Sequence, residues 1–539
     1  MSQPQHPQLS AASDDAKQLR TRPLRTPHSR TYTPGFFFKI AVMALINALG
    51  VYILIQAFTV ESWGVFAGML ALLVLADYVY FSRRALPMKY ILPGLAFLLV
   101  FQVFTVAYTG YVAFTNYGQG HNSTKGDAIE ALLIQNEQRV EGSSSYPLAV
   151  VDRDGELGFA VLEDGDVLVG TAEQPLREVD DAVVSDGTIT EVPGWEILDR
   201  QEVIARQSEV VDLRVPFSED AEAGSVRTQD ARNGFVYRSV LDYDEATDTM
   251  TNVETGVVYT PNDNGQFEAP DGSTLNVGWR VNIGLDNFTT AFADSRYAEP
   301  FLKVLIWTFA FAILTVGLTF FLGLFFALVL NDERVRGRKV MRAFLILPYA
   351  FPAIMSYLLW RGMLNTDYGF INQVLLGGAE IPWLSNEWLA RAVVLGVQLW
   401  VGFPYMFLIT TGALQSIPSD VMEAARIDGA GRWRIFRSMT LPLLFIAVAP
   451  LLISSFAFNF NNFNGIEMLT EGGPRFPDSS VPVGATDILI TMVYSISGLD
   501  GRAATNYGLA SALSLVIFLI VATISVITFR KTQALEDIN

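Results

Sequence analysis

Two sets of polar residues interrupt long apolar stretches of the chain at a spacing that could form a binding site. Both sets have the spacing i, i+4, i+7: Gln398, Gly402 and Tyr405 in one stretch, and Ser455, Asn459 and Asn462 in another. At about 100° per residue, each set lies on one face of a helix. Amide side chains donate and accept hydrogen bonds at once, which matches the hydroxyl groups of a sugar. The ring of Tyr405 could stack on the C–H face of a pyranose, and Gly402 would leave room for such a ring.

Polar residues inside apolar helices have a second common role, which is to join neighbouring helices by hydrogen bonds. For any single residue of the two sets, this packing role is the alternative to ligand binding. Two sets with the same spacing on two helices favour a polar binding site, because polar residues inside a membrane are costly and usually functional.

A third feature is the polar segment EAARIDGAG, residues 423–431, which lies between two apolar stretches and has arginines on both sides of its turn. Its first half, beginning at Glu423, favours a helix, and Gly429 lets the chain turn sharply into a second helix. The small residues Ala424 and Ala425 permit close approach by another protein. The alternative is an amphipathic loop that lies on the lipid headgroups.

The elements that carry these residues are long apolar runs. Of the 539 residues, 51% are hydrophobic and only 17% are charged. Runs of about 20 apolar residues recur, and that length crosses a hydrocarbon core about 30 Å thick. We therefore expect a polytopic α-helical membrane protein with about eight spans, the fifth of them interrupted by Pro348 and Pro352. The expected spans are residues 36–58, 63–81, 90–113, 301–330, 343–361, 391–415, 443–463 and 505–529.

The net charge of −18 is distributed unevenly along the chain. Residues 115–299 contain 36 acidic and 12 basic residues, a net of −24, so the remainder carries +6. The basic residues fall in alternate short loops, and positively charged loops stay cytoplasmic. Both termini and the 423–431 segment are thus predicted to be cytoplasmic, and the acidic region extracytoplasmic. A cation-binding surface is one interpretation of this region, and a solvated exported domain is the favoured one.

The sequence pattern of the acidic region predicts a β-rich domain inserted after the third span. Its residues alternate between apolar and polar, as in LAVVDRDGELGFAVLEDGDVLVG. Asp-Gly pairs at 154–155, 164–165 and 186–187 are typical of two-residue hairpin turns. The predicted organisation is a disordered tail over 1–34, spans one to three over 35–114, the β-rich domain over 115–298, and spans four to eight over 299–539 with a cytoplasmic loop at 416–442.

Several chemistries are excluded by what the sequence lacks. The chain has no cysteine, and His6, His28 and His121 lie outside the expected spans, so no metal site is expected within the membrane. No Gly-x-x-x-x-Gly-Lys-Ser/Thr phosphate loop occurs, so the chain cannot bind ATP in that way. Spans three to eight hold no deeply placed acidic residue for proton coupling. Asp77 is expected to be a charge near the end of the second span.

The 423–431 segment resembles the EAA loop of permease subunits in ATP-binding-cassette (ABC) importers. That pattern is Glu-Ala-Ala, three residues, Gly, nine residues, then Ile-x-Leu-Pro. The residues in register are Glu423, Ala424, Ala425, Gly429, Leu441 and Pro442. Met439 stands at the isoleucine position, which is a mild apolar exchange. In that family the loop docks on the cytoplasmic ATPase subunit, and the resemblance implies the same role for Glu423, Ala424, Ala425 and Gly429.

Further segments are similar to the MalF-type family, the larger permease subunits of maltose importers. They are FTNY at 114–117, LPYAFP at 347–352, WVGFPY at 400–405, FAFNFNNF at 456–463 and LTEGGP at 469–474. The resemblance covers about residues 85–535 and is weak in the middle of the acidic region. It implies that the inserted domain is Ig-like and helps to hold a sugar-binding protein.

The resemblance also implies a sugar site midway through the membrane. The matching positions are Tyr349, Gln398, Gly402, Tyr405, Met406, Ser455, Asn459 and Asn462. Two positions depart from the family, because Gln398 stands where the family has asparagine and Ala353 where it has serine. One longer amide and one lost hydroxyl leave the identity of the sugar open.

We therefore predict a multi-pass permease subunit of the bacterial inner membrane that imports a carbohydrate, with maltose or maltodextrin as the first candidate. The implied partners are a second, MalG-like permease, a MalK-like ATPase homodimer, a MalE-like extracytoplasmic sugar-binding protein and the lipid bilayer, without nucleic acid. The chain is not predicted to be an enzyme or to bind a cofactor, since the partner ATPase would use ATP–Mg. The alternatives are a permease for another disaccharide or oligosaccharide such as trehalose or sucrose, an ATP-independent secondary transporter, and a membrane-anchored glycosidase.

Overall fold

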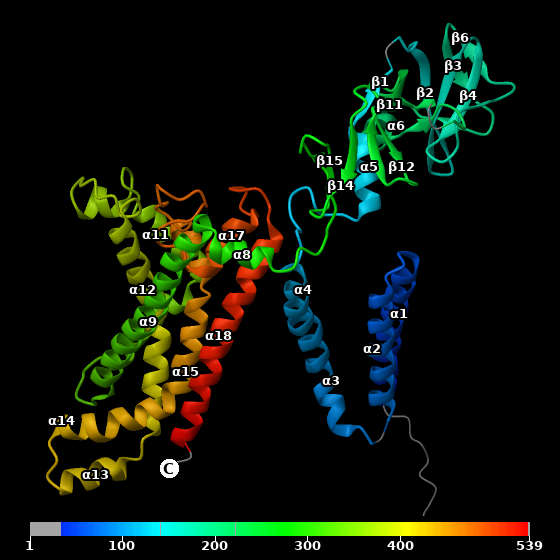
Figure 1. Cartoon of the computed structure of the whole chain (residues 1–539). Helices are drawn as coiled ribbons and strands as arrows, with labels where there is room; N and C mark the ends of the chain where they lie inside the picture. The colour runs from blue at the N-terminus through cyan, green and yellow to red at the C-terminus, as the bar shows by residue number, and fades with distance from the viewer. Residues whose placement is uncertain (1–33, 83, 141, 221–222, 537–539) are drawn as a thin grey trace, which may run out of the picture. The chain divides into compact units, whose positions relative to one another are not determined.

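The computed structural model describes residues 34–82, 84–140, 142–220 and 223–536. The predicted disordered tail therefore lies outside the described residues, apart from Pro34, where the first helix begins. The chain divides into two compact units, Met1–Thr105 and Val106–Asn539. Figure 1 shows the course of the chain and the element labels used below.

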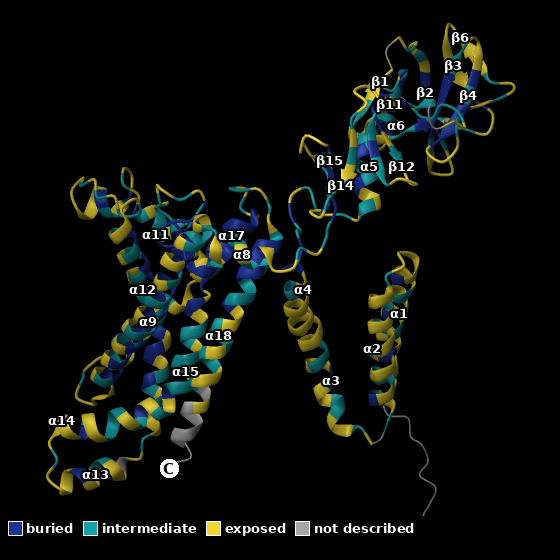
Figure 2. Ribbon diagram, in the orientation of Figure 1, coloured by how far each residue is buried: buried dark blue, intermediate teal, exposed yellow. Residues whose placement is uncertain are grey.

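The first unit contains a helical hairpin of α1 (Pro34–Thr59) and α2 (Trp63–Phe81). Its apolar side chains are mostly exposed, as expected for helices that face lipid (Figure 2). Asp77 lies near the end of α2, and Asn47 Nδ2 donates a hydrogen bond to its Oδ1 over 3.0 Å. The charge near the helix end, predicted from the sequence, thus has a polar partner within the hairpin.

The third span, Leu86–Val112, crosses the boundary between the two units. It consists of α3 (Leu86–Leu98), a π-helical turn η1 (Leu99–Val103) and α4 (Phe104–Val112). After α4, the chain is fixed by Asn287, whose Nδ2 donates hydrogen bonds to the carbonyls of Ala113 and Thr115.

The second unit carries the remaining long apolar helices. They are α9 (Ser295–Asn331), α12 (Glu387–Ser416), α15 (Leu441–Phe460) and α18 (Tyr507–Glu536). Among the described residues, seven helices are long and apolar enough to cross a membrane. A bent pair of helices gives an eighth span if it is counted as one. The predicted fold class, a polytopic helical membrane protein with a β-rich insert after the third span, is confirmed.

The bent pair lies at the fifth predicted span. It comprises α10 (Arg338–Ile346), the 3-10 turn η3 (Leu347–Ala350) and α11 (Ala353–Met363), and its two halves meet at 90°. Pro348 lies in the first turn of η3 and Pro352 is the residue before α11. Proline has no N–H to donate to the preceding turn, so a continuous helix cannot form across this segment.

Helices α9 and α12 form the most buried pair of the bundle. Of the most apolar window of each helix, 39% is buried, compared with 11% for α1. Gly323 permits their close contact, because a Cβ at this position would lie 2.6 Å from the Phe407 backbone nitrogen. Helix α15 packs against both α9 and α18.

The β-rich region lies between the third and fourth spans, and its strands pair antiparallel. The largest sheet has the order β5-β4-β3-β2-β11-β10-β9, while β12 to β15 and β6 to β7 form smaller sheets. The strands are β1 (Glu137–Arg139), β2 (Tyr146–Arg153), β3 (Glu156–Glu163), β4 (Asp166–Thr171), β5 (Arg177–Glu178), β6 (Val183–Ser185), β7 (Thr188–Glu191), β8 (Glu196–Ile197), β9 (Val215–Pro216), β10 (Ser225–Thr228), β11 (Asn233–Ser239), β12 (Leu241–Asp244), β13 (Thr249–Asn252), β14 (Val258–Pro261) and β15 (Phe267–Glu268).

The three predicted Asp-Gly hairpin turns are confirmed. They join β2 to β3, β3 to β4 and β6 to β7, and in each pair both residues have positive φ. Consecutive residues of β2, Val150 and Val151, are both buried although they point to opposite faces of the sheet. The sheet is therefore covered on both sides. Short helices complete the region and its exit: α5 (Lys125–Gln135), α6 (Arg200–Ala205), α7 (Gln207–Asp212) and α8 (Asp286–Ala293).

Candidate functional site

A cavity of about 640 Å³ lies among α9, η3, α11, α12 and α15. Seven of the eight residues that the sequence suggested for a sugar site line it: Tyr349, Gln398, Gly402, Tyr405, Met406, Ser455 and Asn459. The structure thus brings together residues that are more than 100 positions apart in the chain. Their role in binding stays a prediction.

Asn462 does not line the cavity. Helix α15 ends at Phe460, so Asn462 lies beyond the helix on which the angular count had placed it. Its Oδ1 accepts a hydrogen bond from the Gly465 backbone over 3.1 Å and caps α16 (Phe463–Thr470). Its Nδ2 is buried near the Tyr357 hydroxyl but makes no hydrogen bond within the part of the chain that the structure describes.

A chain of hydrogen bonds runs along one wall of the cavity. The Tyr357 hydroxyl donates to Gln398 Oε1 over 2.9 Å, and Gln398 Nε2 donates to Asn459 Oδ1 over 3.2 Å. Asn459 Nδ2 in turn donates to the Ser455 carbonyl over 2.8 Å. The side chains of Tyr357, Gln398 and Asn459 are buried. The amides predicted to meet a sugar therefore pair with each other here.

Aromatic rings form the more open part of the cavity. Tyr349 from η3 and Tyr405 from α12 stack with their centroids 6.2 Å apart and their planes 19° apart. Both rings are exposed. A stacked pair that presents apolar faces and hydroxyl edges suits a ligand with apolar and hydroxyl-rich sides.

Gly402 lines the cavity, but its missing side chain does not simply leave room for a ligand. A Cβ at this position would lie 3.0 Å from Cγ2 of Thr319 on α9. Gly402 therefore serves at least in part to let α12 approach α9. Met406 is also buried, in a cluster with Phe320 of α9.

The cavity wall is uncharged. Its lining, as far as the described residues show, contains no Asp, Glu, Lys, Arg or His. A charged ligand would find no counter-ion there, and an isolated charge in an apolar setting is costly. The arrangement suits a neutral molecule with several hydroxyl groups.

Sequence reasoning missed four polar lining residues, Tyr357, Thr315, Thr319 and Ser454. Tyr349, Ala353 and Tyr357 follow each other at intervals of four, which was an available signal for Tyr357. The two threonines of α9 are also four apart. Threonine is common in membrane helices, where its hydroxyl can bond to the preceding turn, as Thr319 does to the Thr315 carbonyl over 2.7 Å.

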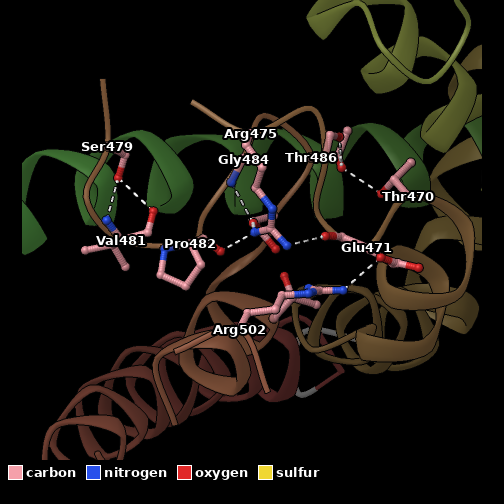
Figure 3. Close-up of polar contacts among 12 residues, drawn as sticks. Thr470, Glu471, Arg475, Ser479, Val481, Pro482, Gly484, Thr486 and Arg502 are labelled. Carbon is pink, nitrogen blue, oxygen red and sulfur yellow. Dashed lines mark hydrogen bonds and ion pairs between the residues drawn. The ribbon is translucent and has the colours of Figure 1, made fainter. Parts of the chain in front are cut away.

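A cluster of charged residues lies where α11 meets the segment between α16 and α17 (Leu489–Ser497). We call it the Glu471 cluster: Arg361, Glu471, Arg475, Asp487 and Arg502. Glu471 accepts hydrogen bonds from Arg361 over 2.7 Å and Arg502 over 2.9 Å. Its carbonyl accepts one from Arg475, which also donates to the Pro482 carbonyl (Figure 3).

Asp487 is the most buried member of this cluster, with a side chain only 1% exposed. Its Oδ2 accepts a hydrogen bond from the Gly484 backbone over 2.7 Å and lies 3.5 Å from Arg475. Burial raises the pKa of Asp487 to about 6, although the Gly484 bond and Arg475 act in the opposite direction. The pKa of Glu471 is lowered, chiefly by its hydrogen bond with Arg361.

The 416–442 segment forms the predicted pair of helices, α13 (Ser419–Ile427) and α14 (Arg432–Ile435), followed by the π-helical turn η5 (Phe436–Thr440). Gly429 has φ +78° and makes the turn between them. Glu423 and Ala424 are exposed, whereas Ala425 is buried. Ile427 and Trp433 are exposed instead, at 81% and 71%.

Two segments of the amino-acid sequence match known protein families. Residues 293–536 match the family described as binding-protein-dependent transport system inner membrane component. Residues 96–173 match the N-terminal part of the transmembrane subunit in binding-protein-dependent ABC transporters. The chain is therefore a multi-pass permease component of a binding-protein-dependent ABC transporter in the inner membrane.

Sequence similarity to individual proteins identifies the family of permeases to which the chain belongs. The maltose/maltodextrin transport system permease protein MalF of Vibrio vulnificus is 35% identical over 514 residues, which are 93% of this chain and 96% of that protein. MalF of Salmonella typhimurium is 33% identical (93% and 97% covered), and MalF of Escherichia coli O6:H1 is 32% identical (96% and 100% covered). This chain belongs to the MalF family.

Among solved structures, a bacterial ABC transporter involved in import of the acidic polysaccharide alginate matches 47% of this chain and 84% of its own, at 22% identity and a TM-score of 0.40.

Proposed function

We propose that this chain forms half of the translocation path of a maltose or maltodextrin importer and holds the sugar in the cavity of its membrane helices. The names of its relatives give the candidate sugar. The observation that carries the proposal is the uncharged cavity, whose lining includes a stacked aromatic pair and two hydrogen-bonded amides. Rings that stack and amides that donate and accept are the groups a neutral oligosaccharide requires.

The proposed sugar contacts are Tyr349, Gln398, Gly402, Tyr405, Met406, Ser455, Asn459 and Asn462. Asn462 would reach the sugar only after a rearrangement, because it caps α16 outside the cavity. Trehalose or sucrose remains the alternative, since the Gln398 amide is longer than the asparagine of the family. The aromatic pair and the amide wall would accommodate any of these neutral sugars.

Coupling to ATP would occur through the 416–442 segment on the cytoplasmic side. Its exposed Glu423, with Ala424, Ala425 and the turn at Gly429, would dock on an ATPase subunit. The helix pair leads through η5 directly into α15, which carries Ser455 and Asn459. A displacement of the docked loop would therefore act on a helix that lines the cavity.

The partners of this proposal are a MalG-like permease, a MalK-like ATPase homodimer that uses ATP–Mg, and a MalE-like binding protein. The β-rich domain, within residues 115–298, would face the binding protein. Residues 299–539 would form the permease core. This chain would hold no cofactor itself.

Reconstitution in proteoliposomes tests the proposal. The complex with ATPase and binding protein should take up maltose only when ATP is present, and binding protein loaded with maltose should stimulate ATPase activity. The same assay with maltotriose, trehalose and sucrose identifies the preferred sugar. Uptake by the permeases without the ATPase subunits would instead establish a secondary transporter.

A substitution tests the site. Asn459→Leu should abolish or redirect sugar recognition while the complex still assembles. Unchanged uptake and sugar preference in this variant would show that the polar residues only join helices.

A further inference from the structure

Tyr357 is the first residue of the hydrogen-bond chain that follows the cavity wall, and it comes from a different helix than the others. It lies on α11, Gln398 lies on α12, and Asn459 lies on α15 (Figure 1). Its side chain is 3% exposed and its ring packs in a cluster with Val394 and Val397 of α12. The Tyr357 hydroxyl is thus held in place before any ligand arrives.

The direction of every bond in the chain is fixed from one end. The Ser455 carbonyl can only accept, so Asn459 must turn its Nδ2 toward it and its Oδ1 toward Gln398. Gln398 must then offer Nε2 to Asn459, which leaves its Oε1 facing Tyr357. Only a donor can satisfy that oxygen, and the Tyr357 hydroxyl is that donor.

The direction of these hydrogen bonds determines which donor and acceptor groups the cavity wall can present to a ligand. The Gln398–Asn459 bond, at 3.2 Å, is the longest of the three. If a ligand opens it, Gln398 presents a donor from α12 and Asn459 presents an acceptor from α15. One hydroxyl group can accept from the first and donate to the second at once. A group that only accepts or only donates cannot replace the bond completely.

We infer that Tyr357 is a positioning residue for sugar recognition, which holds the Gln398 amide so that its Nε2, and not its Oε1, faces the incoming hydroxyl. This inference rests on the proposed function, because it assigns an additional residue to the same sugar site. Without the tyrosine hydroxyl, Gln398 Oε1 loses its donor, and the amide is free to rotate once a ligand opens the Gln398–Asn459 bond. The sugar then meets a site that must be ordered again at each binding event.

The test is a double-mutant cycle in the complete reconstituted transporter, with maltose as the probe. Tyr357→Phe keeps the ring and removes the hydroxyl. Gln398→Met keeps the approximate length of the side chain and removes its hydrogen bonds. We expect Tyr357→Phe alone to raise the KM for maltose uptake about tenfold with little change in kcat, because the Gln398 amide must be ordered at each binding event. In the Gln398→Met background, the same substitution should leave KM unchanged.

A role of Tyr357 in packing alone would give the opposite pattern. The KM would then rise by the same factor in both backgrounds, and kcat and assembly would fall with it. That result, or an unchanged KM in Tyr357→Phe alone, overturns the inference while the proposed function stands. If the single Tyr357→Phe complex assembles poorly, a rise in KM when Tyr357→Phe is added to Gln398→Met still overturns the inference. Absence of ATP-dependent uptake of any sugar by the wild-type complex overturns the proposed function, and this inference with it.

Discussion

Gly323 on α9 lies directly against the backbone of Met406 on α12. A Cβ at position 323 would be 2.7 Å from the Met406 carbonyl carbon, a contact that side-chain rotation cannot relieve. The two helices supply Thr315, Thr319, Gln398 and Tyr405 to the cavity wall. This contact therefore fixes the spacing of two of the helices that line the site.

Gly323→Ala should force α9 and α12 apart and destabilise the protein by about 1–3 kcal/mol, the usual cost of overpacking. Gly317→Ala is the matched control on the same helix, because a Cβ there meets nothing within 4 Å. The thermal unfolding midpoint of the detergent-solubilised complex should fall for the first variant only. Equal midpoints for the two variants would show that the contact is not tight.

The turn between α13 and α14 provides a test of coupling. Gly429 has φ +78°, where a β-branched residue is strongly disfavoured, whereas Gly431 has φ −69°. At both positions a Cβ would meet nothing within 4 Å, so the two differ in backbone conformation and not in available space. Gly429→Val should reduce sugar uptake per ATP hydrolysed severalfold, while Gly431→Val should have little effect. Similar coupling ratios in the two variants would argue against a role for the turn.

Glu471 should contribute to stability through charge-assisted hydrogen bonds. Glu471→Gln keeps its shape but removes the carboxylate that pairs with Arg361 and one of the three carboxylates that pair with Arg502, the others being Glu467 and Asp500. Because the side chain is 42% exposed, we expect a loss of only about 1 kcal/mol. Glu299→Gln, at an exposed pair with Lys303 alone, is the control and should change the unfolding midpoint by less. A larger fall of the unfolding midpoint in Glu299→Gln than in Glu471→Gln would contradict this expectation.

We expect the local stability around Asp487 to depend on pH, because the pKa of this residue is raised. Its pKa in the folded protein is about 6, above the ordinary value of 3.8, so the folded state binds the proton more tightly than the unfolded state. Stability around Asp487 should therefore fall as the pH rises from about 4 to about 6, by about 3 kcal/mol in total, and stay level above that.

Hydrogen exchange of the Gly484 amide, corrected for its intrinsic pH dependence, measures this effect. The charged groups that act on Asp487 are Arg475, which lowers its pKa, and Glu467, which raises it. Asp487→Asn should remove the dependence between pH 4 and 6. An identical profile in that variant would assign the titration to Glu467, whose pKa is raised by burial as well.

The spans and the hairpin turns could be predicted from the sequence because their signals are local. Apolar runs of fixed length, Asp-Gly pairs and the prolines at 348 and 352 act through the backbone of their own segment. Five of the cavity residues could be predicted for the same reason, since a helical spacing defines a face, whereas Tyr349 and Met406 followed only from the family resemblance.

The remaining features depend on contacts between segments. The prediction that Asn462 shares a face with Ser455 and Asn459 assumed that the helix continues past Phe460. Helix α15 ends at Phe460 instead. Tyr357 meets Gln398 through a contact between α11 and α12 that joins residues 41 positions apart in the chain. The contact of Gly402 with Thr319 depends on where α9 crosses α12, which no local pattern encodes.

The uncharged cavity wall has an electrical consequence. Moving one elementary charge through a membrane potential of about 100 mV involves roughly 2.3 kcal/mol. A neutral sugar that passes along walls without ionisable groups carries none of that energy with it. In the proposed importer, the voltage across the membrane would then neither pull the solute inward nor hold it back, and accumulation against a gradient would draw its work from nucleotide hydrolysis in the partner subunits.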